Sequence, residues 1–226
     1  MRQHLLIDAD DTLWENNIYF ERAFARFCEY LDHSVFDDET VRGLLDEVEL
    51  VNIRLHGYGS ANFGRNMIEC FHNLAERPVT AADDEHIRGI ARGINDHALE
   101  ILEGVPETLE YLASRHHVVM VTKGDAAEQT CKIDQSGLRA LFCDVVILRE
   151  KDAQTYRNVV TKHGMDQDLT WMIGNSPKSD INPAMQAGIG AVYVPHPRTW
   201  HLEHQEIVPC GRLHVVEKFR DLRRLF

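Results

Sequence analysis

Three carboxylates and a hydroxyl follow a short apolar run near the start of the chain. Asp8, Asp10, Asp11 and Thr12 come directly after residues 5–7. An apolar run of this length predicts a buried strand, so the charges lie at its carboxyl end. Like charges this close persist only with a cation, a proton or strong hydrogen-bond donors, and a divalent metal is the simplest compensation. Asp8 and Asp10 are the candidates, whereas Asp11 is expected to turn the chain and cap the next helix.

A second apolar run ends in a hydroxyl and a glycine. Thr122, Lys123 and Gly124 follow residues 118–121 and precede a predicted helix. A side-chain donor next to free backbone N–H groups at a helix start can bind an oxyanion. The pattern is common in proteins, so by itself it is weak evidence for such a site.

Two further segments provide a cation and more oxygen ligands. Lys151 begins the helix after a third predicted strand, where an isolated lysine is usually solvated. Asn175 and Asp180 follow a fourth predicted strand. A carboxylate and a neutral amide oxygen are both suitable ligands for Mg²⁺.

Together, these four segments resemble the motifs of the haloacid dehalogenase (HAD) superfamily. The matches are Asp-x-Asp-x-Thr after a strand, a strand ending in Thr, a lysine with Tyr156 five residues later, and a strand followed by Gly and an acidic residue. Two positions depart from the usual pattern: Asn175 replaces the first aspartate of the fourth motif, and Asp152 follows Lys151 where proline is common. The resemblance runs from Leu5 to about Val194, and the insertion between the first two motifs indicates the C1-capped type.

The resemblance implies phosphoryl transfer through an aspartyl-phosphate. Asp8 would be the nucleophile, and Asp10 would protonate the leaving oxygen and then deprotonate the attacking water. We expect Asp8 to raise the pKa of Asp10, while Mg²⁺ keeps Asp8 ionised. The implied metal ligands are Asp8, the Asp10 backbone carbonyl, Asn175 and Asp180, and the implied phosphate-binding residues are Thr122, Lys123, Gly124 and Lys151.

The favoured interpretation is a Mg²⁺-dependent phosphomonoester hydrolase acting on a small phosphorylated metabolite. Haloacid dehalogenation is less favoured because enzymes of that branch carry a different residue at the position of Asp10. Phosphonate hydrolysis is less favoured because residues 15–101 contain no cap lysine. A phosphomutase with the same motifs, or a noncatalytic phospho-ligand binder with a degenerate metal site at Asn175, remains open.

The spacing of apolar residues predicts the elements that position these side chains. Helical periodicity in 20–31, 41–55, 63–74 and 87–101 predicts an all-helical cap over residues 15–101. Strands and helices then alternate, with strands near 118–121, 145–148, 170–173, 191–194 and 214–216. Residues 1–14 and 102–226 are therefore expected to form an α/β core, a Rossmann-like parallel sheet that includes the first strand.

Substrate choice is expected to depend on the cap. The candidate lining residues surround the Gly-Tyr-Gly interruption between the second and third helices or adjoin the first motif, and are Trp14, Asn17, Arg54, His56, Tyr58 and Arg65. His196 follows the last clear strand and could reach the cleft. A second metal site near it lacks an evident third ligand.

Composition narrows the class of protein. The 226 residues carry a net charge of -12, which opposes binding to nucleic acid. No apolar run reaches the roughly 18 residues of a membrane span, and no signal-peptide pattern is present, so we expect a cytoplasmic protein. The five cysteines are scattered, which favours reduced thiols.

Overall fold

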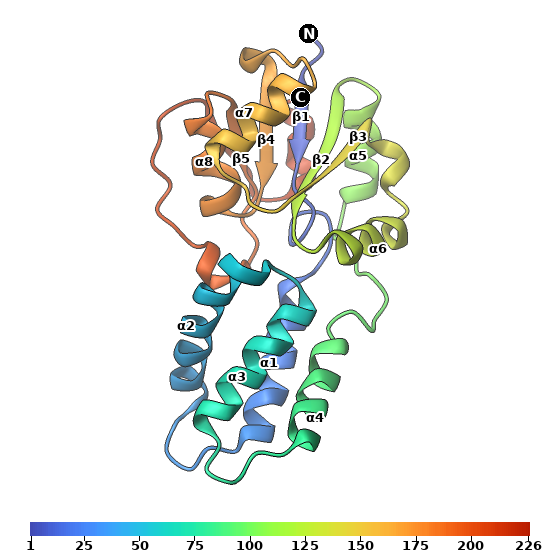
Figure 1. Cartoon of the computed structure of the whole chain (residues 1–226). Coiled ribbons are helices and arrows are strands. Elements are labelled where there is room, and N and C mark those ends of the chain that lie inside the picture. The colour runs from blue at the N-terminus through green and yellow to red at the C-terminus, as the bar shows by residue number, and fades with distance from the viewer. The chain divides into compact units, whose positions relative to one another are not determined.

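The computed structural model describes residues 1–226 and divides the chain into two compact units (Figure 1). One unit contains Met1–Asn17 and Leu99–Phe226, and the other contains Ile18–Ala98. The first is an α/β unit and the second consists of helices. No helix in either unit is both long enough and apolar enough to cross a membrane.

The α/β unit is built on a six-stranded parallel sheet with the order β3-β2-β1-β4-β5-β6. The strands are β1 (His4–Ile7), β2 (His117–Lys123), β3 (Asp144–Leu148), β4 (Thr170–Gly174), β5 (Gly190–Tyr193) and β6 (Leu213–Val215). The first strand pairs with β2 on one side and β4 on the other. The prediction of a Rossmann-like parallel sheet that includes the first strand is therefore confirmed.

Helices cover both faces of this sheet. Side chains alternate along β1, so Leu5 and Ile7 pack against one set of helices and Leu6 against the other. On the first face lie α5 (Val105–Ala113) and α6 (Ala126–Ser136), with the C-terminal 3₁₀ turn Phe219–Arg224. On the second face lie α7 (Ala153–Lys162) and α8 (Asn182–Gln186). Burial on both faces explains why the strands read as continuous apolar runs.

The helical unit is formed by α1 (Asn17–Leu31), α2 (Asp38–His56), α3 (Ser60–Leu74) and α4 (Ala81–Arg92). Its core is rich in aromatic side chains from α1 and α3, including Phe27 and Phe71. The helical insertion is thus confirmed, but the predicted continuation of the fourth helix to Ile101 is wrong. Gly93 follows the last helical residue, and Asn95 and Asp96 next to it favour a turn. Ile101 instead forms an antiparallel bridge with Trp14.

Strands β4 and β5 approach each other closely at Gly190. This glycine is the register partner of Trp171, and a Cβ atom added to it would overlap the indole ring. The ring stacks on His214 and contacts Phe226 edge-on, so it has little freedom to move away. The absence of a side chain at Gly190 is therefore required by packing.

We expect Gly190→Ala to lower the free energy of unfolding by about 1–3 kcal/mol, because the added methyl group overpacks the sheet. Urea denaturation would measure the change. Gly43→Ala is the matched control, since nothing lies within 4 Å of its added Cβ on α2. The control should be neutral or stabilising by up to about 1 kcal/mol, because alanine is the better helix former. Equal stability of wild type and Gly190→Ala would contradict the packing argument.

Candidate active site

Three of the predicted site residues come together because β1 lies between β2 and β4. Asp8 directly follows β1, Thr122 lies near the end of β2, and Asn175 directly follows β4. The Asp8 N–H donates to the carbonyl of Ile173 at 2.9 Å, which continues the β1–β4 pairing up to the acidic residue. The carboxyl ends of adjacent parallel strands are where open α/β sheets bind ligands.

A lysine from outside these three strands joins two of the carboxylates. The Lys151 Nζ lies 2.5 Å from Oδ1 of Asp8 and 2.7 Å from Oδ1 of Asp180. All three side chains are buried, with at most 6% of any residue exposed. Lys151 lies between β3 and α7, far from Asp8 in the sequence, and the two residues meet because β1 and β3 belong to the same sheet. The structure therefore brings together Asp8, Lys151 and Asp180.

Thr12 links this group to Asn175. Its Oγ1 lies 2.9 Å from Oδ2 of Asp8 and 3.2 Å from Oδ1 of Asn175. The Asn175 Nδ2 donates to Oγ1 of Thr199, which fixes the amide with its oxygen toward Thr12. The amide oxygen is thus oriented toward the same cluster as the Asp8 carboxylate.

Asp180 is positioned by an unusual turn. Residues Pro177–Ile181 form a π-helical turn, a geometry that often occurs at functional sites. Ser176 begins the turn, and its N–H donates to Oδ2 of Asp180 at 3.0 Å. A Cβ atom added to Gly174 would overlap the Asp180 carboxylate, so only glycine allows this approach. The π-helical turn, the Ser176 hydrogen bond and the space left by Gly174 together orient the Asp180 carboxylate toward Lys151.

The donor set fits a hard divalent cation. Two buried carboxylates, Asp8 and Asp180, share one ammonium, so these three groups carry an excess of negative charge when ionised. Asn175 adds a neutral oxygen nearby. Oxygen ligands of this kind suit Mg²⁺, which is usually bound by one or two carboxylates and several waters. Asp8, Asp180 and Asn175 are the residues that could hold it.

The pKa values of the cluster reflect burial and mutual attraction. Burial raises the pKa of Asp8 to about 7; Lys151 opposes this rise and Asp180 adds to it. Burial by itself would lower the pKa of Lys151, but Asp180 and Asp8 raise it above its usual value. The ammonium therefore stays charged, whereas burial disfavours the ionised form of Asp8.

Asp10 is bound by a different set of donors. The Lys132 Nζ lies 2.6 and 2.7 Å from its two carboxylate oxygens. Gln129 Nε2 donates to Oδ2 at 2.8 Å, and Trp14 Nε1 donates to Oδ1 at 2.7 Å. The Lys132 ammonium also donates to Oδ1 of Asn16, so it is fixed on both sides. With its side chain held in this way, Asp10 could reach a metal only through its backbone carbonyl.

The expected pKa order of the two aspartates is wrong. Burial would raise the pKa of Asp10, but the Lys132 ammonium and the hydrogen bonds from Gln129 and Trp14 lower it below its usual value. In this structure Asp8 has the raised pKa and Asp10 the lowered one. The physical reason is the Lys132 ammonium beside Asp10, which lies 122 residues away in the sequence.

Lys132 and Gln129 are thus the residues that sequence reasoning missed. Both are buried on α6, and with Ile133 they form the inward face of that helix. A lysine at an inward helical position is rarely fully buried unless it is paired. That position was the available signal, and it pointed to a carboxylate partner on the sheet.

Thr122 and Gly124 have defined partners at the end of β2. The Thr122 Oγ1 lies 3.3 Å from Oε1 of Gln129, and the residue is only 1% exposed. The Gly124 N–H donates to the carbonyl of Leu148, and the backbone of Gly124 has a φ of 146° that favours glycine. The Gly124 amide is therefore engaged by the neighbouring strand β3.

Lys123 points its ammonium at a segment far along the chain. Its Nζ lies 2.7 Å from Oε1 of Glu203 and 2.8 Å from Oγ of Ser179. Glu203 is buried and also accepts a hydrogen bond from Ser176. Although burial would raise the pKa of Glu203, the Lys123 ammonium lowers it. Lys123 thus ties the loop after β5 to the turn that carries Asp180.

Asp11 caps the following helix, as expected. Its carboxylate accepts the N–H groups of Asn16 and Asn17, and its backbone is left-handed with a φ of 56°. His196 lies close by, with Nδ1 3.9 Å from Asp11 and Nε2 3.5 Å from Glu15. The structure thereby gives His196 two acidic neighbours that the sequence did not indicate.

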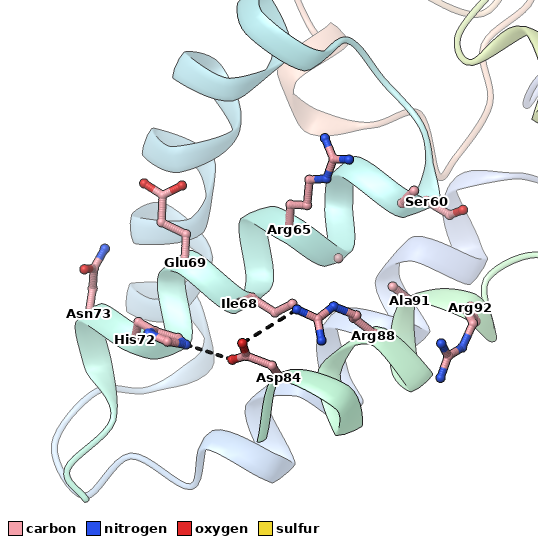
Figure 2. Close-up of a pocket in the computed structure, with 12 residues that line it drawn as sticks. Ser60, Arg65, Ile68, Glu69, His72, Asn73, Asp84, Arg88, Ala91 and Arg92 are labelled. Atoms are coloured by element: carbon pink, nitrogen blue, oxygen red, sulfur yellow. Dashed lines mark hydrogen bonds and ion pairs between the residues drawn. The ribbon is translucent and has the colours of Figure 1, made fainter. Parts of the chain in front are cut away.

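The candidate cap residues Arg54, Tyr58 and Arg65 lie around the turn between α2 and α3. Trp14 belongs instead to the Asp10 cluster and is fully buried. A groove of about 680 Å³ lies between α3 and α4 and includes Arg65 (Figure 2). Its Asp84 is paired within the groove, 2.8 Å from His72 and 3.6 Å from Arg88.

Comparison with known proteins identifies relatives of the chain. A family model described as haloacid dehalogenase-like hydrolase matches residues 3–188. Pyrimidine 5'-nucleotidase PynA of Streptococcus pneumoniae is 29% identical over 136 residues, or 53% of this chain and 57% of that protein. The chain therefore spans little more than half the length of this curated relative.

Solved structures resemble the whole chain. A haloacid dehalogenase-like family hydrolase from Xanthomonas campestris is 33% identical with a TM-score of 0.85, covering 99% of this chain and 91% of that one. The magnesium-bound putative HAD-hydrolase YfnB from Bacillus subtilis has 15% identity and a TM-score of 0.70, covering 99% and 98%. At that identity the likeness shows the fold alone, as it does for a 2-haloacid dehalogenase from Pseudomonas syringae at 18% identity.

We expect Lys151→Met to lower the free energy of unfolding by roughly 3–5 kcal/mol, because it leaves Asp8 and Asp180 buried without their cation. Urea denaturation near neutral pH, without added metal, would measure the loss. Lys162→Met is the control: it removes an exposed lysine at the end of α7 and should change stability by no more than about 0.5 kcal/mol. Equal effects of the two substitutions would contradict the buried network.

Proposed function

Because the chain belongs to the haloacid dehalogenase-like hydrolases, we propose that it is a Mg²⁺-dependent phosphatase acting on a small phosphorylated metabolite. The observation that carries the proposal is the convergence of Asp8, Lys151 and Asp180 at the carboxyl edge of the sheet. A nucleophilic carboxylate beside a fixed ammonium suits an anionic substrate, since the cation stabilises charge on the transferring group.

In this proposal Asp8 and Asp10 divide the chemistry. An Asp8 oxygen attacks phosphorus, and the bond to the leaving oxygen breaks as that oxygen takes a proton from Asp10. For this step Asp10 must be protonated in the substrate complex, although the Lys132 ammonium lowers its pKa in the free protein. Water then attacks the aspartyl-phosphate, Asp10 receives the water proton, and Asp8 and inorganic phosphate are released. Magnesium, when bound by Asp8, Asp180 and Asn175, would neutralise charge on the phosphoryl oxygens.

We place the phosphoryl group among Asp8, Thr122 and Lys151. Thr122 supplies a hydroxyl and Lys151 an ammonium at the ends of neighbouring elements. Lys123 and Gly124 support this site indirectly, because the Lys123 ammonium is paired with Glu203 and the Gly124 amide with β3. This refines the expectation that all four residues contact phosphate.

Two considerations guide the substrate class. The named relative from Streptococcus pneumoniae is a pyrimidine 5'-nucleotidase, so nucleoside monophosphates are the first substrates to examine. Dehalogenation is less favoured, because it needs no acid at position 10, whereas here Asp10 is held by three side chains. Such elaborate support for one carboxylate favours a reaction that requires it.

The test is hydrolysis of an aryl phosphate, followed by a panel of phosphorylated metabolites that includes nucleoside monophosphates. Wild-type protein should release phosphate with Mg²⁺ and lose activity with EDTA. Asp8→Asn should reduce kcat by roughly 10³-fold or more, because the nucleophile is lost. The control Asp134→Asn, an exposed residue of α6, should retain wild-type kinetics.

Several outcomes would overturn the proposal. Equal rates in wild type and Asp8→Asn would exclude Asp8 as nucleophile. Phosphate binding without turnover over the whole panel would favour a noncatalytic binder. Conversion of a phosphorylated sugar to its isomer without phosphate release would favour a phosphomutase, and release of halide from 2-chloropropionate would favour a dehalogenase.

A second prediction concerns the lysine beside Asp10. Lys132→Met should lower kcat roughly 10- to 100-fold, because Asp10 loses the contact that orients it toward the reacting oxygens. KM should stay nearly constant, since Lys132 contacts Asp10 rather than the proposed phosphoryl site. Steady-state kinetics with Lys162→Met as control would measure both constants, and an unchanged kcat would contradict the orienting role.

A further inference from the structure

Helix α2 carries an apolar stripe that the helical unit does not bury. Val41 and Leu45 face the core of the unit, but Val51 and Leu55 are 61% and 64% exposed. Leu44 and Val48 are half-buried and continue the same line. Residues 44, 48, 51 and 55 follow the spacing of a single helix face, so together they form one continuous stripe.

The stripe lies on an edge helix. Within the helical unit α3 lies between α2 and α4, so one flank of α2 has no neighbouring helix there (Figure 1). Single exposed apolar residues are ordinary on protein surfaces, but a contiguous stripe indicates an interaction surface. The remaining question is what covers it.

The charges beside the stripe are complementary to those of a second copy of the chain. Glu47 and Arg54 lie two turns apart along the same flank of α2, and both are exposed. Neither forms an ion pair or a side-chain hydrogen bond within the chain. An acidic and a basic residue arranged in this way complement the same pair on an antiparallel copy of the helix.

We propose that α2 forms the interface of a homodimer, with two copies of the helix packed antiparallel. A two-fold axis near the middle of the stripe sets Leu44 opposite Leu55 and Val48 opposite Val51 of the second copy. The same axis sets Glu47 beside Arg54 of the second copy, and repeats that pair by symmetry. A parallel arrangement would instead place like charges together.

The expected dimer is weak. A stable protein interface buries at least about 1,200 Å² in total, more than one pair of short helices provides. We therefore expect a dissociation constant in the micromolar range, with dimer and monomer in exchange. The inference does not depend on the proposed enzymatic function, because none of the stripe residues belongs to the candidate active site.

Sedimentation velocity of the full chain, from about 1 to about 500 μM, tests the proposal. Wild type should shift from monomer to dimer as the concentration rises. Val51→Glu should weaken the dimer by at least about tenfold, because each added carboxylate would be buried against the apolar Val48 of the second copy. Leu50→Glu is the matched control: Leu50 is 47% exposed on the same helix but lies off the stripe, so its dimer should keep the wild-type constant.

Charge exchange distinguishes the antiparallel pairing from other arrangements. Glu47→Arg and Arg54→Glu should each abolish self-association, because each creates two like-charge pairs. A mixture of these two variants should form a heterodimer, and the double variant should regain the homodimer. Far-UV circular dichroism would confirm that every variant is folded. A wild-type monomer at every concentration, or a mixture that stays monomeric, would overturn the proposal.

Discussion

The Lys151 ammonium between Asp8 and Asp180 is the contact on which the arrangement of the active-site unit depends. Removing three charged groups from water is costly, and the cost is offset only when each group keeps its partners. Here both carboxylates share one ammonium, while Thr12 and the amide of Ser176 satisfy their remaining oxygens. The excess of negative charge that remains is what makes the cluster suited to a cation.

The order of the sheet makes this contact possible. Because β1 is central, the residues after it are flanked by the ends of β2 and β4, and every connection between them passes over a face of the sheet. Lys151 and Asp180 each begin or precede a helix on one of those faces. The segments that follow β1, β2, β3 and β4 are distant in sequence, but all of them therefore lie at the carboxyl edge of the sheet.

The sequence predicted the positions of those site residues that lie at the end of a strand. Asp8, Thr122 and Asn175 could be predicted because apolar runs mark where strands stop, and parallel strands end at one edge. The partners of Asp10 and Lys123 could not be predicted in this way. The inward position of Lys132 on α6 indicates a carboxylate partner but does not say which one, and Glu203 reaches Lys123 from a loop, which leaves no periodic signal. The pKa order of the aspartates failed for the same reason.

The two aspartates of the first motif also show how neighbours in sequence acquire different properties. Burial and a separate lysine for each dominate the forces on them, and their mutual repulsion is a minor contribution: Lys151 pairs with Asp8 and Lys132 with Asp10. Asp8 shares its lysine with a second carboxylate, whereas Asp10 receives additional donors from Gln129 and Trp14. Their different pKa values follow from this inequality of partners, which is set by the packing of α6 and the loop before α7.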